Sequence, residues 1–183
     1  GINGQTLWTR EMISYEPKEL LELPLPGGNS DIIAAEYFNR IHRLNGANGE
    51  IVWTYPLGSS AGVIQIALIN DLNNDQVSDV LIASFANNGL NCLRGATGAQ
   101  LWSWQMDYQF GVATIPDIDE DGSEDVLAAA RYGNFYCISG KGDSLIYLHS
   151  FPGDWMYSVN KIPSIDGNFS YEMLAGTRDG KVV

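Results

Sequence analysis

The sequence predicts an all-β protein built from repeated four-stranded antiparallel sheets. Three observations lead to this prediction: two sequence patterns recur with the same period, short β-rich segments alternate with turn residues, and glycine is abundant while lysine is rare. The chain has 183 residues, of which 45% are hydrophobic and 20 are glycine. A chain of this length is expected to form one domain with its own core.

The first repeated pattern is an acidic residue followed by a short apolar strand. Its four copies begin 48, 46 and 47 residues apart and read DIIAAEY from Asp31, DVLIASF from Asp79, DVLAAAR from Asp125 and EMLAGTR from Glu172. The second pattern has the same period in another phase, with NGQTLW, NGEIVW, TGAQLW and a weaker KGDSLI ending at Trp8, Trp53, Trp102 and Ile146. Repeats of about 40 to 50 residues with one aromatic signature are typical of β-propeller blades.

The third repeat shows the strands expected of one blade, at 110–118, 125–131, 135–139 and 144–150. Gly- and Asn-containing turns between such strands favour successive antiparallel hairpins. We therefore predict four blades of four strands within residues 1–183, as a single β-propeller domain or a fragment of one. The repeat boundaries are expected near Trp8, Trp53, Trp102 and Ile146.

The number of blades in the complete ring is open at this point. The chain ends in nearly the same phase of the repeat in which it begins, so four blades could close with a strand from the N-terminus. A larger propeller of about seven or eight blades is favoured, because four blades are the lower limit of the usual range.

Two acidic loops carry the clearest chemical signal, DLNNDQVSD at 71–79 and DIDEDGSED at 117–125. Both fit D-x-[DN]-x-D-x-x-x-D, which places side-chain oxygens at positions 1, 3, 5 and 9 and a backbone carbonyl at position 7. Six or seven oxygen ligands suit Ca²⁺. We predict two calcium sites, with the ligands Asp71, Asn73, Asp75, Val77 and Asp79 in the first and Asp117, Asp119, Asp121, Ser123 and Asp125 in the second.

The two loops differ from EF-hands and from each other. Position 12 would be Glu in an EF-hand, whereas Ile82 and Ala128 stand there. The second loop is expected to bind more tightly, because it has Gly122 at the sharp turn where the first has Gln76. The alternative is that both are solvated Asp- and Asn-rich turns; their shared spacing and phase favour the cation.

The sequence also resembles two groups of propellers. The acidic loop followed by a DVLIAS-type strand is similar to the calcium-binding repeats of FG-GAP and integrin-α-like (VCBS-type) propellers. The segments LRGATGAQLW and LNGANGEIVW resemble the tryptophan-docking repeats of quinoprotein (PQQ-like) propellers. The second resemblance implies that the three periodic tryptophans, Trp8, Trp53 and Trp102, pack against the Gly-containing turn of an adjacent repeat.

The chain departs from both groups. Phe110-Gly111 is the nearest remnant of the Phe-Gly and Gly-Ala-Pro elements. Quinoprotein dehydrogenases have adjacent cysteines beside their cofactor, whereas Cys92 and Cys137 occupy equivalent positions in successive repeats. We therefore predict no PQQ.

We predict a binding surface rather than an active site. His42 and His149 fall on strands of different blades, and paired carboxylates occur only in the cation loops. The face opposite those loops is expected to carry Trp155, Tyr108, Tyr132, Arg131 and Arg178. Aromatic rings beside polar groups suit the recognition of a protein or glycan; the alternative is that Trp155 and Tyr108 only fill the channel mouth.

The predicted function is that of a non-catalytic, calcium-stabilised propeller of a secreted or cell-surface protein, acting in adhesion or in protein or glycan binding. The alternatives are the scaffold of a polysaccharide lyase-like enzyme, a quinoprotein dehydrogenase-like protein, and a structural spacer between other domains. The net charge of -12 argues against a nucleic-acid partner, and without an apolar stretch of about 18 residues we expect no membrane insertion.

Calcium loops of this kind work at roughly micromolar to millimolar calcium, which predicts an extracellular or cell-surface location, with the periplasm as the alternative. Further blades or domains of the same polypeptide are additional expected partners.

Overall fold

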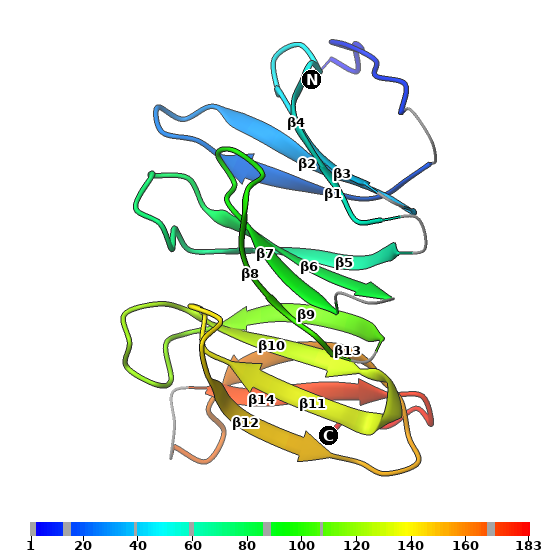
Figure 1. The fold of residues 1–183 in the computed structure, drawn as a ribbon, viewed down its shortest axis with the longest axis vertical. Coiled ribbons are helices and arrows are strands. Elements are labelled where there is room, and N and C mark those ends of the chain that lie inside the picture. Colours follow the sequence, from blue (N-terminus) through cyan, green and yellow to red (C-terminus); the bar gives the residue numbers. More distant parts are fainter. Residues whose placement is uncertain are drawn as a thin grey trace.

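The computed structural model describes residues 3–12, 16–38, 40–58, 61–85, 89–106, 108–167 and 171–183. Within these residues, three four-stranded antiparallel sheets and one two-stranded sheet follow one another along the chain (Figure 1). The strands are β1 (Pro17–Pro24), β2 (Ser30–Glu36), β3 (Arg40–Leu44) and β4 (Ile51–Pro56) in the first sheet; β5 (Gly62–Ile69), β6 (Asp79–Phe85), β7 (Leu90–Leu93) and β8 (Gln100–Trp104) in the second; β9 (Gln109–Ile115), β10 (Asp125–Ala130), β11 (Asn134–Ile138) and β12 (Leu145–Ser150) in the third; and β13 (Met156–Pro163) and β14 (Tyr171–Thr177) in the fourth.

Each sheet is a propeller blade, and the predicted fold class is confirmed. Strands pair in the order in which they occur in the sequence, so each blade is a simple meander. In the third blade, β9 ends at Ile115, earlier than predicted. The physical reason is Pro116, which has no N–H to donate and begins the acidic loop.

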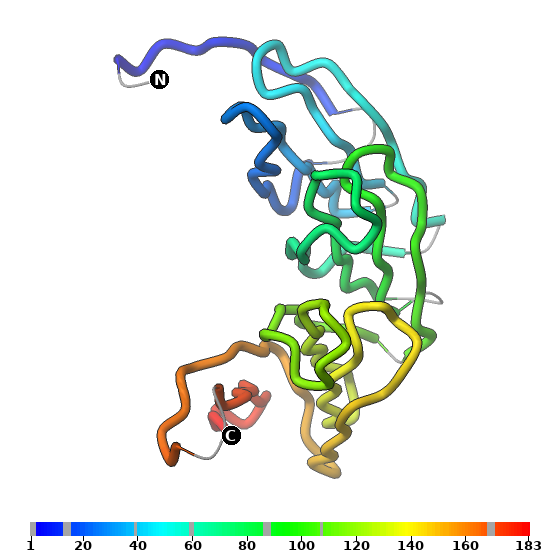
Figure 2. The backbone as a smooth tube through the Cα atoms, turned by 90° about the vertical axis from the view of Figure 1, so that its left-hand side faces the viewer, coloured from blue at the N-terminus to red at the C-terminus, as the bar shows by residue number. Residues whose placement is uncertain are grey.

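The blades lie side by side along an open arc (Figure 2). The first strands β1, β5, β9 and β13 contact one another in sequence. Side chains link them at the same repeat position: the Glu19 carboxylate accepts the Ile66 N–H at 2.7 Å, and the Gln65 side-chain oxygen accepts the Val112 N–H at 3.0 Å.

The core consists of three apolar clusters, each of which lies between two neighbouring blades. The second strands β6 and β10 are buried along nearly their whole length. Both faces of these strands pack against other blades, which explains why DVLIAS and DVLAAA are almost continuously apolar rather than alternating. Burial of each such Val, Leu or Ile side chain contributes about 1.5–3 kcal/mol.

The periodic tryptophans bind the turn of the following blade, as the quinoprotein resemblance implies. Their indole N–H groups donate at 2.9 Å to the carbonyls of Gly46, Gly95 and Gly140, from Trp8, Trp53 and Trp102 respectively. A second glycine in each turn has a positive φ near 73°, and a Cβ there would lie within 2.8 Å of the indole: these are Gly49, Gly98 and Gly142. The glycines and tryptophans therefore form one repeated joint between blades.

The fourth blade contains β13, β14 and the beginning of a third strand, because Ala175 and Val183 exchange two backbone hydrogen bonds of 2.9 Å. An open groove of about 850 Å³ runs between β12 and β14, where outer strands lie in the other blades. The two ends of the chain lie at opposite ends of the arc (Figure 2). Within the described residues, no helix is long and apolar enough to cross a membrane.

Candidate functional site

The two predicted calcium loops share one backbone shape. Positions 4 and 6 of each loop are left-handed: Asn74 (φ 60) and Gln76 (φ 69) in the first loop, and Glu120 (φ 61) and Gly122 (φ 91) in the second. In both loops the first Asp accepts the backbone N–H groups of positions 5 and 6, with the position 6 bond at 2.6 Å to Asp71 and at 2.7 Å to Asp117. The sixth position therefore requires a positive φ in both, which costs a non-Gly residue about 1 kcal/mol.

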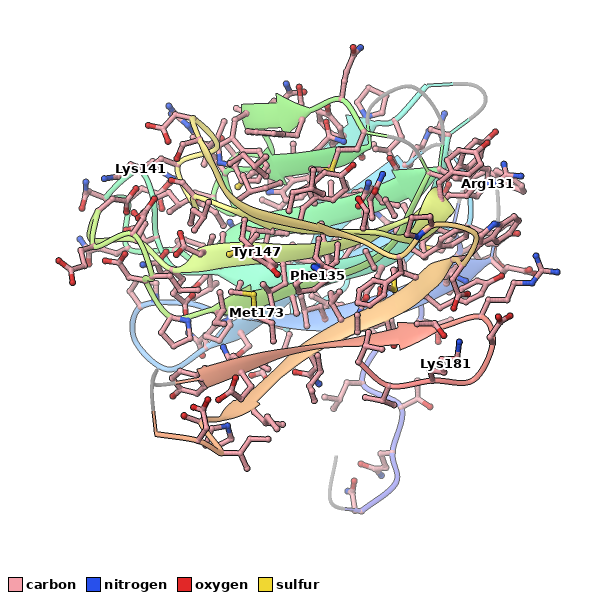
Figure 3. All side chains as sticks on the ribbon, turned by 90° about the horizontal axis from the view of Figure 1, so that it is seen from below. Arg131, Phe135, Lys141, Tyr147, Met173 and Lys181 are labelled. Atoms are coloured by element: carbon pink, nitrogen blue, oxygen red, sulfur yellow. The ribbon has the colours of Figure 1, made fainter. Side chains whose placement is uncertain are left out.

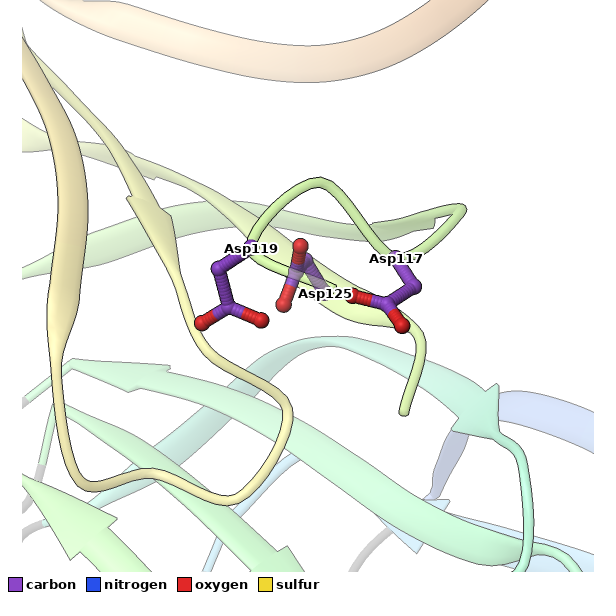
Figure 4. Close-up of side chains that lie close together, drawn as sticks. All are labelled: Asp117, Asp119 and Asp125. Atoms are coloured by element: carbon purple, nitrogen blue, oxygen red, sulfur yellow. The ribbon is translucent and has the colours of Figure 1, made fainter. Parts of the chain in front are cut away.

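The second loop brings three carboxylates together. Asp117, Asp119 and Asp125 each offer an oxygen that lies within 4.8 Å of those of the other two (Figure 4). Oxygens around one Ca²⁺, each at about 2.3–2.6 Å from the ion, have such separations. Burial, the Asp121 charge and the Asp117 charge raise the pKa of Asp119. A bound cation would reduce the repulsion between these negative charges.

The fourth predicted carboxylate of this loop faces a different group. Asp121 accepts a hydrogen bond from the Ser139 hydroxyl at 3.0 Å and lies 3.3 Å from Lys141 Nζ. Ser123, predicted to contribute its carbonyl, is buried and donates its N–H to Asp121 at 2.9 Å. The structure thus joins three of the predicted carboxylates and directs Asp121 toward the next turn.

The first loop is held together by an amide instead of a carboxylate cluster. Asn73 Nδ2 donates to both oxygens of Asp79, at 3.1 and 3.3 Å, and the Val77 N–H donates to Asp75 at 3.0 Å. Asp71, Asp75 and Asp79 do not form a three-carboxylate group among the described residues. The first loop therefore has the Asn73 amide where the second has the Asp119 carboxylate.

The Asp at position 9 has the same structural role in the first three blades. Asp31, Asp79 and Asp125 accept the N–H of the turn glycines Gly46, Gly95 and Gly140 at 3.0–3.2 Å. Burial raises the pKa of Asp79 and of Asp125. These carboxylates would be stabilised in their charged form by any nearby cation.

Among the ion pairs of the described residues, Asp31 is the only one of these three Asp residues that pairs with a guanidinium group. Arg43 Nε lies 2.6 Å from Asp31 Oδ2, and both side chains are buried. The same register position holds Cys92 in the second blade and Cys137 in the third. The first blade, which lacks the acidic loop, thus has a guanidinium beside this Asp, whereas the second and third blades have a cysteine at that register position. Alignment of the repeats carried this signal, but we had not predicted the role of Arg43.

The five residues predicted on the opposite face form one cluster. The guanidinium carbon of Arg131 lies 4.5 Å from the ring centre of Trp155, 5.3 Å from Tyr108 and 5.2 Å from Tyr132. Arg178 lies 4.9 Å from the same Trp155 ring. Figure 3 shows Arg131 and Lys141, which lies beside the acidic loop, at opposite ends of the blades. We refer to these five residues as the arginine–aromatic cluster.

The repeat itself positions the two arginines. Arg131 follows β10 and donates its N–H to the Tyr108 carbonyl, and Arg178 follows β14 and donates to the Trp155 carbonyl, both at 2.8 Å. Tyr132 has φ 68, a strained conformation for a bulky side chain. Phe110, which we had interpreted only as an FG remnant, stacks on Trp155 with 5.9 Å between ring centres.

The two histidines are accounted for structurally. His42 Nδ1 lies 2.8 Å from Thr54 Oγ1, and Nε2 lies 3.3 Å from Glu36 Oε1; His42 and Glu36 are fully buried. Burial lowers the pKa of His42 despite the opposing effect of Glu36. His149, on the exposed strand β12, stacks with Tyr147 and packs at a tilt against Phe151.

Comparisons with solved structures agree with the fold. The WD40 β-propeller domain of Doa1 superposes with a TM-score of 0.70 at 13% identity, over 96% of this chain and 52% of that one. The computationally designed Ika4 protein gives 0.68 at 14% identity, over 98% and 96%. BamB from Moraxella catarrhalis gives 0.58 at 11% identity, over 87% and 44%.

Sequence comparison identifies the family. Mouse protein FAM234A is 29% identical in an alignment of 98 residues that covers 49% of this chain and 18% of the mouse protein, so the chain matches less than a fifth of that relative's length. The family model described as the FAM234A/B beta-propeller matches residues 38–147, which include both acidic loops predicted to bind calcium and part of the arginine–aromatic cluster. The chain therefore belongs to the FAM234A/B β-propeller family.

Proposed function

We propose that this chain is a calcium-stabilised recognition module, with no catalytic role of its own, that binds a protein or glycan ligand through the arginine–aromatic cluster. The observation that supports recognition is the convergence of Arg131 and Arg178 on Trp155, beside the half-exposed rings of Tyr108 and Tyr132. Aromatic and arginine side chains are the residues most often responsible for binding energy at protein interfaces.

Calcium would act on the opposite face, where it would hold the long loops between first and second strands in place. Asp117, Asp119 and Asp125 fit a hard cation because their oxygens already lie within 4.8 Å of one another. In the first loop, rotation of the Asn73 amide would turn its oxygen toward the ion. Asp79 and Asp125 would gain the positive charge that Arg43 supplies to Asp31 in the first blade.

A binding role fits the chemistry of the described residues better than catalysis. The carboxylates that converge are cation ligands, His42 is fully buried, and burial raises the pKa of both Cys92 and Cys137, so neither thiol is a ready nucleophile. The feature that this chain shares with quinoprotein propellers is the contact between each periodic tryptophan and the turn of the next blade. This contact is structural, and we propose no PQQ site.

The proposed location is extracellular or at the cell surface, in keeping with loops of the micromolar-to-millimolar calcium class. A role in adhesion would follow if the ligand is carried by another cell or by the surrounding matrix. In that setting the propeller presents its arginine–aromatic cluster on one face and is stiffened by calcium on the other.

A pair of matched tyrosine variants tests recognition. Tyr132 is 54% exposed within the cluster and Tyr147 is 46% exposed on β12, outside it. In calcium-containing buffer, the protein is applied to peptide and glycan arrays; Tyr132→Ala is expected to weaken the strongest signals about tenfold or more, and Tyr147→Ala to leave them unchanged. Equal effects of both variants, or the absence of any array signal, would rule out recognition through this face.

A further inference from the structure

The charge of the arginine–aromatic cluster indicates a class of ligand. Building on the proposed recognition role of this face, we propose that Arg131 and Arg178 bind the carboxylates of a short, extended acidic segment of a partner protein. Trp155 holds the two guanidinium groups in place between aromatic walls, and the acidic segment would lie across them.

Aromatic rings lie against both guanidinium groups. Both guanidinium carbons lie within 5 Å of the Trp155 ring centre, which is cation–π distance. Arg131 Nε is buried and makes no hydrogen bond. A guanidinium held in this way presents paired N–H groups that match the two oxygens of a carboxylate.

The local carboxylate is already bound to other groups. Asp154 precedes Trp155, and it accepts the Trp155 N–H at 2.7 Å. Burial would raise its pKa, but hydrogen bonds from Trp155, Thr177 and Asp179 and the nearby Lys181 charge lower it below the usual value. Among the ion pairs of the described residues, none involves Arg131 or Arg178. The two guanidinium charges therefore lack a carboxylate partner in this part of the structure.

The distance between the arginines suits an extended peptide. Because both lie close to the same ring, their guanidinium carbons are less than about 10 Å apart. In an extended chain, side chains on the same face repeat every second residue, about 6.5–7 Å along the strand. Two acidic residues in an i, i+2 arrangement would therefore reach both arginines, and Tyr108 and Tyr132 would flank them.

The charge distribution of the whole molecule favours a short ligand over a long polyanion. β10 has six residues, so the cluster lies about 20 Å from the acidic loop at the other end of the strand. This is about two and a half times the Debye length of about 8 Å at physiological ionic strength, so the loop has little effect on the potential at the two arginines. A long sulfated glycan would extend over a protein of net charge -12 and would meet repulsion beyond the cluster.

The test uses isotope-labelled protein with calcium present and three probes: the acetylated, amidated peptide Gly-Asp-Tyr-Glu-Gly, its Asn/Gln counterpart, and a heparin hexasaccharide. Binding is followed by NMR through the indole N–H of Trp155 and the Nε–H of Arg131 and Arg178. We expect the acidic peptide to shift these signals and to bind at least about tenfold more tightly than the amide peptide.

Arg131→Gln and Arg178→Gln are each expected to reduce affinity for the acidic peptide about tenfold. Arg94→Gln is the control, because Arg94 is exposed in the turn between β7 and β8, at the other face. Arg131→Lys keeps the positive charge but lacks the paired N–H groups, so it is a milder change that is less prone to disturb folding. It is expected to lose most of the affinity for the acidic peptide. Equal affinity for the two peptides, or an equal loss with Arg94→Gln, would overturn the proposal.

The remaining outcomes separate this inference from the proposed function. Tighter binding of the heparin hexasaccharide than of the acidic peptide, with loss in the Arg131 and Arg178 variants, would overturn the peptide class while leaving recognition by this face intact. If no probe shifts the NMR signals and the peptide and glycan arrays show no binding, both the acidic-peptide inference and the proposed recognition function would be rejected.

Discussion

The glycine at the tip of each blade turn leaves room for one specific tryptophan. A Cβ on Gly98 would approach the Trp53 ring to 2.7 Å, and the residue has φ 73. Gly28 has a similar positive φ of 82, but a Cβ there would have no neighbouring atom within 4 Å. These two glycines separate the cost of the backbone conformation from the cost of displacing an indole.

We predict that Gly98→Ala lowers the free energy of unfolding by about 2–4 kcal/mol, because it adds overpacking to the cost of a positive φ. Gly28→Ala should cost only about 1 kcal/mol. Urea unfolding followed by tryptophan fluorescence measures both. Similar losses for the two variants would show that the Trp53 contact contributes little to the joint.

His42 gives the protein a predicted pH dependence. Burial lowers its pKa below the usual 6.5, so the unfolded chain binds more protons than the native protein once the pH falls below that value. The free energy of unfolding should therefore decrease as the pH falls from 7.5 to 5.5, by on the order of 1 kcal/mol. His42→Gln should flatten this slope and His149→Gln should preserve it. A slope that persists in His42→Gln would assign the effect to other groups.

At the scale of the elements, Arg43 links the first blade to the second and supplies a positive charge beside the buried Asp31. Arg43 pairs with Asp31 at 2.6 Å and also donates to the carbonyls of Gly95 and Ala96 in the second blade, at 3.1 and 3.0 Å. Its side chain is therefore both the counter-ion of a buried carboxylate and a link between two blades.

Arg43→Met is predicted to destabilise the protein by about 3–5 kcal/mol, because it leaves the Asp31 carboxylate buried without a counter-charge. Asp31→Asn in the same background should recover part of the loss, since the amide oxygen can still accept the Gly46 N–H. Thermal and urea unfolding of the single and double variants provide the comparison. A double variant less stable than Arg43→Met would contradict the charge argument.

Short-range patterns in the sequence were sufficient to predict the strands. They did not predict the contacts between one turn and the next. The period of the Asp and Trp patterns placed the blades, and repeat phase put Arg131, Arg178 and Trp155 on one face before their contacts were known. Asp121 is an example: its spacing predicts a ligand, and spacing alone did not predict that it also contacts Ser139 and Lys141 of the following turn. The pairing of Arg43 with Asp31 likewise depends on neighbouring strands.

At the scale of the whole molecule, the blades form an arc with chemically different faces. The acidic loops between β5 and β6 and between β9 and β10 project from the same side of the stack (Figure 1), and the arginine–aromatic cluster lies at the other ends of the strands. This arrangement allows metal binding and ligand binding to be tested separately.

The most direct test of a calcium-stabilised propeller is thermal unfolding with calcium, with magnesium and with a chelator, on the natural sequence, on Asp117→Asn with Asp119→Asn, and on the exposed control Asp143→Asn. Our account predicts that calcium raises the unfolding midpoint by several degrees, on the scale of about 2–4 °C for each kcal/mol. Magnesium should do so less, the double variant should lose most of the shift, and the control should retain it. An unfolding midpoint that is the same with calcium and with chelator would contradict the calcium assignment and the extracellular location inferred from it.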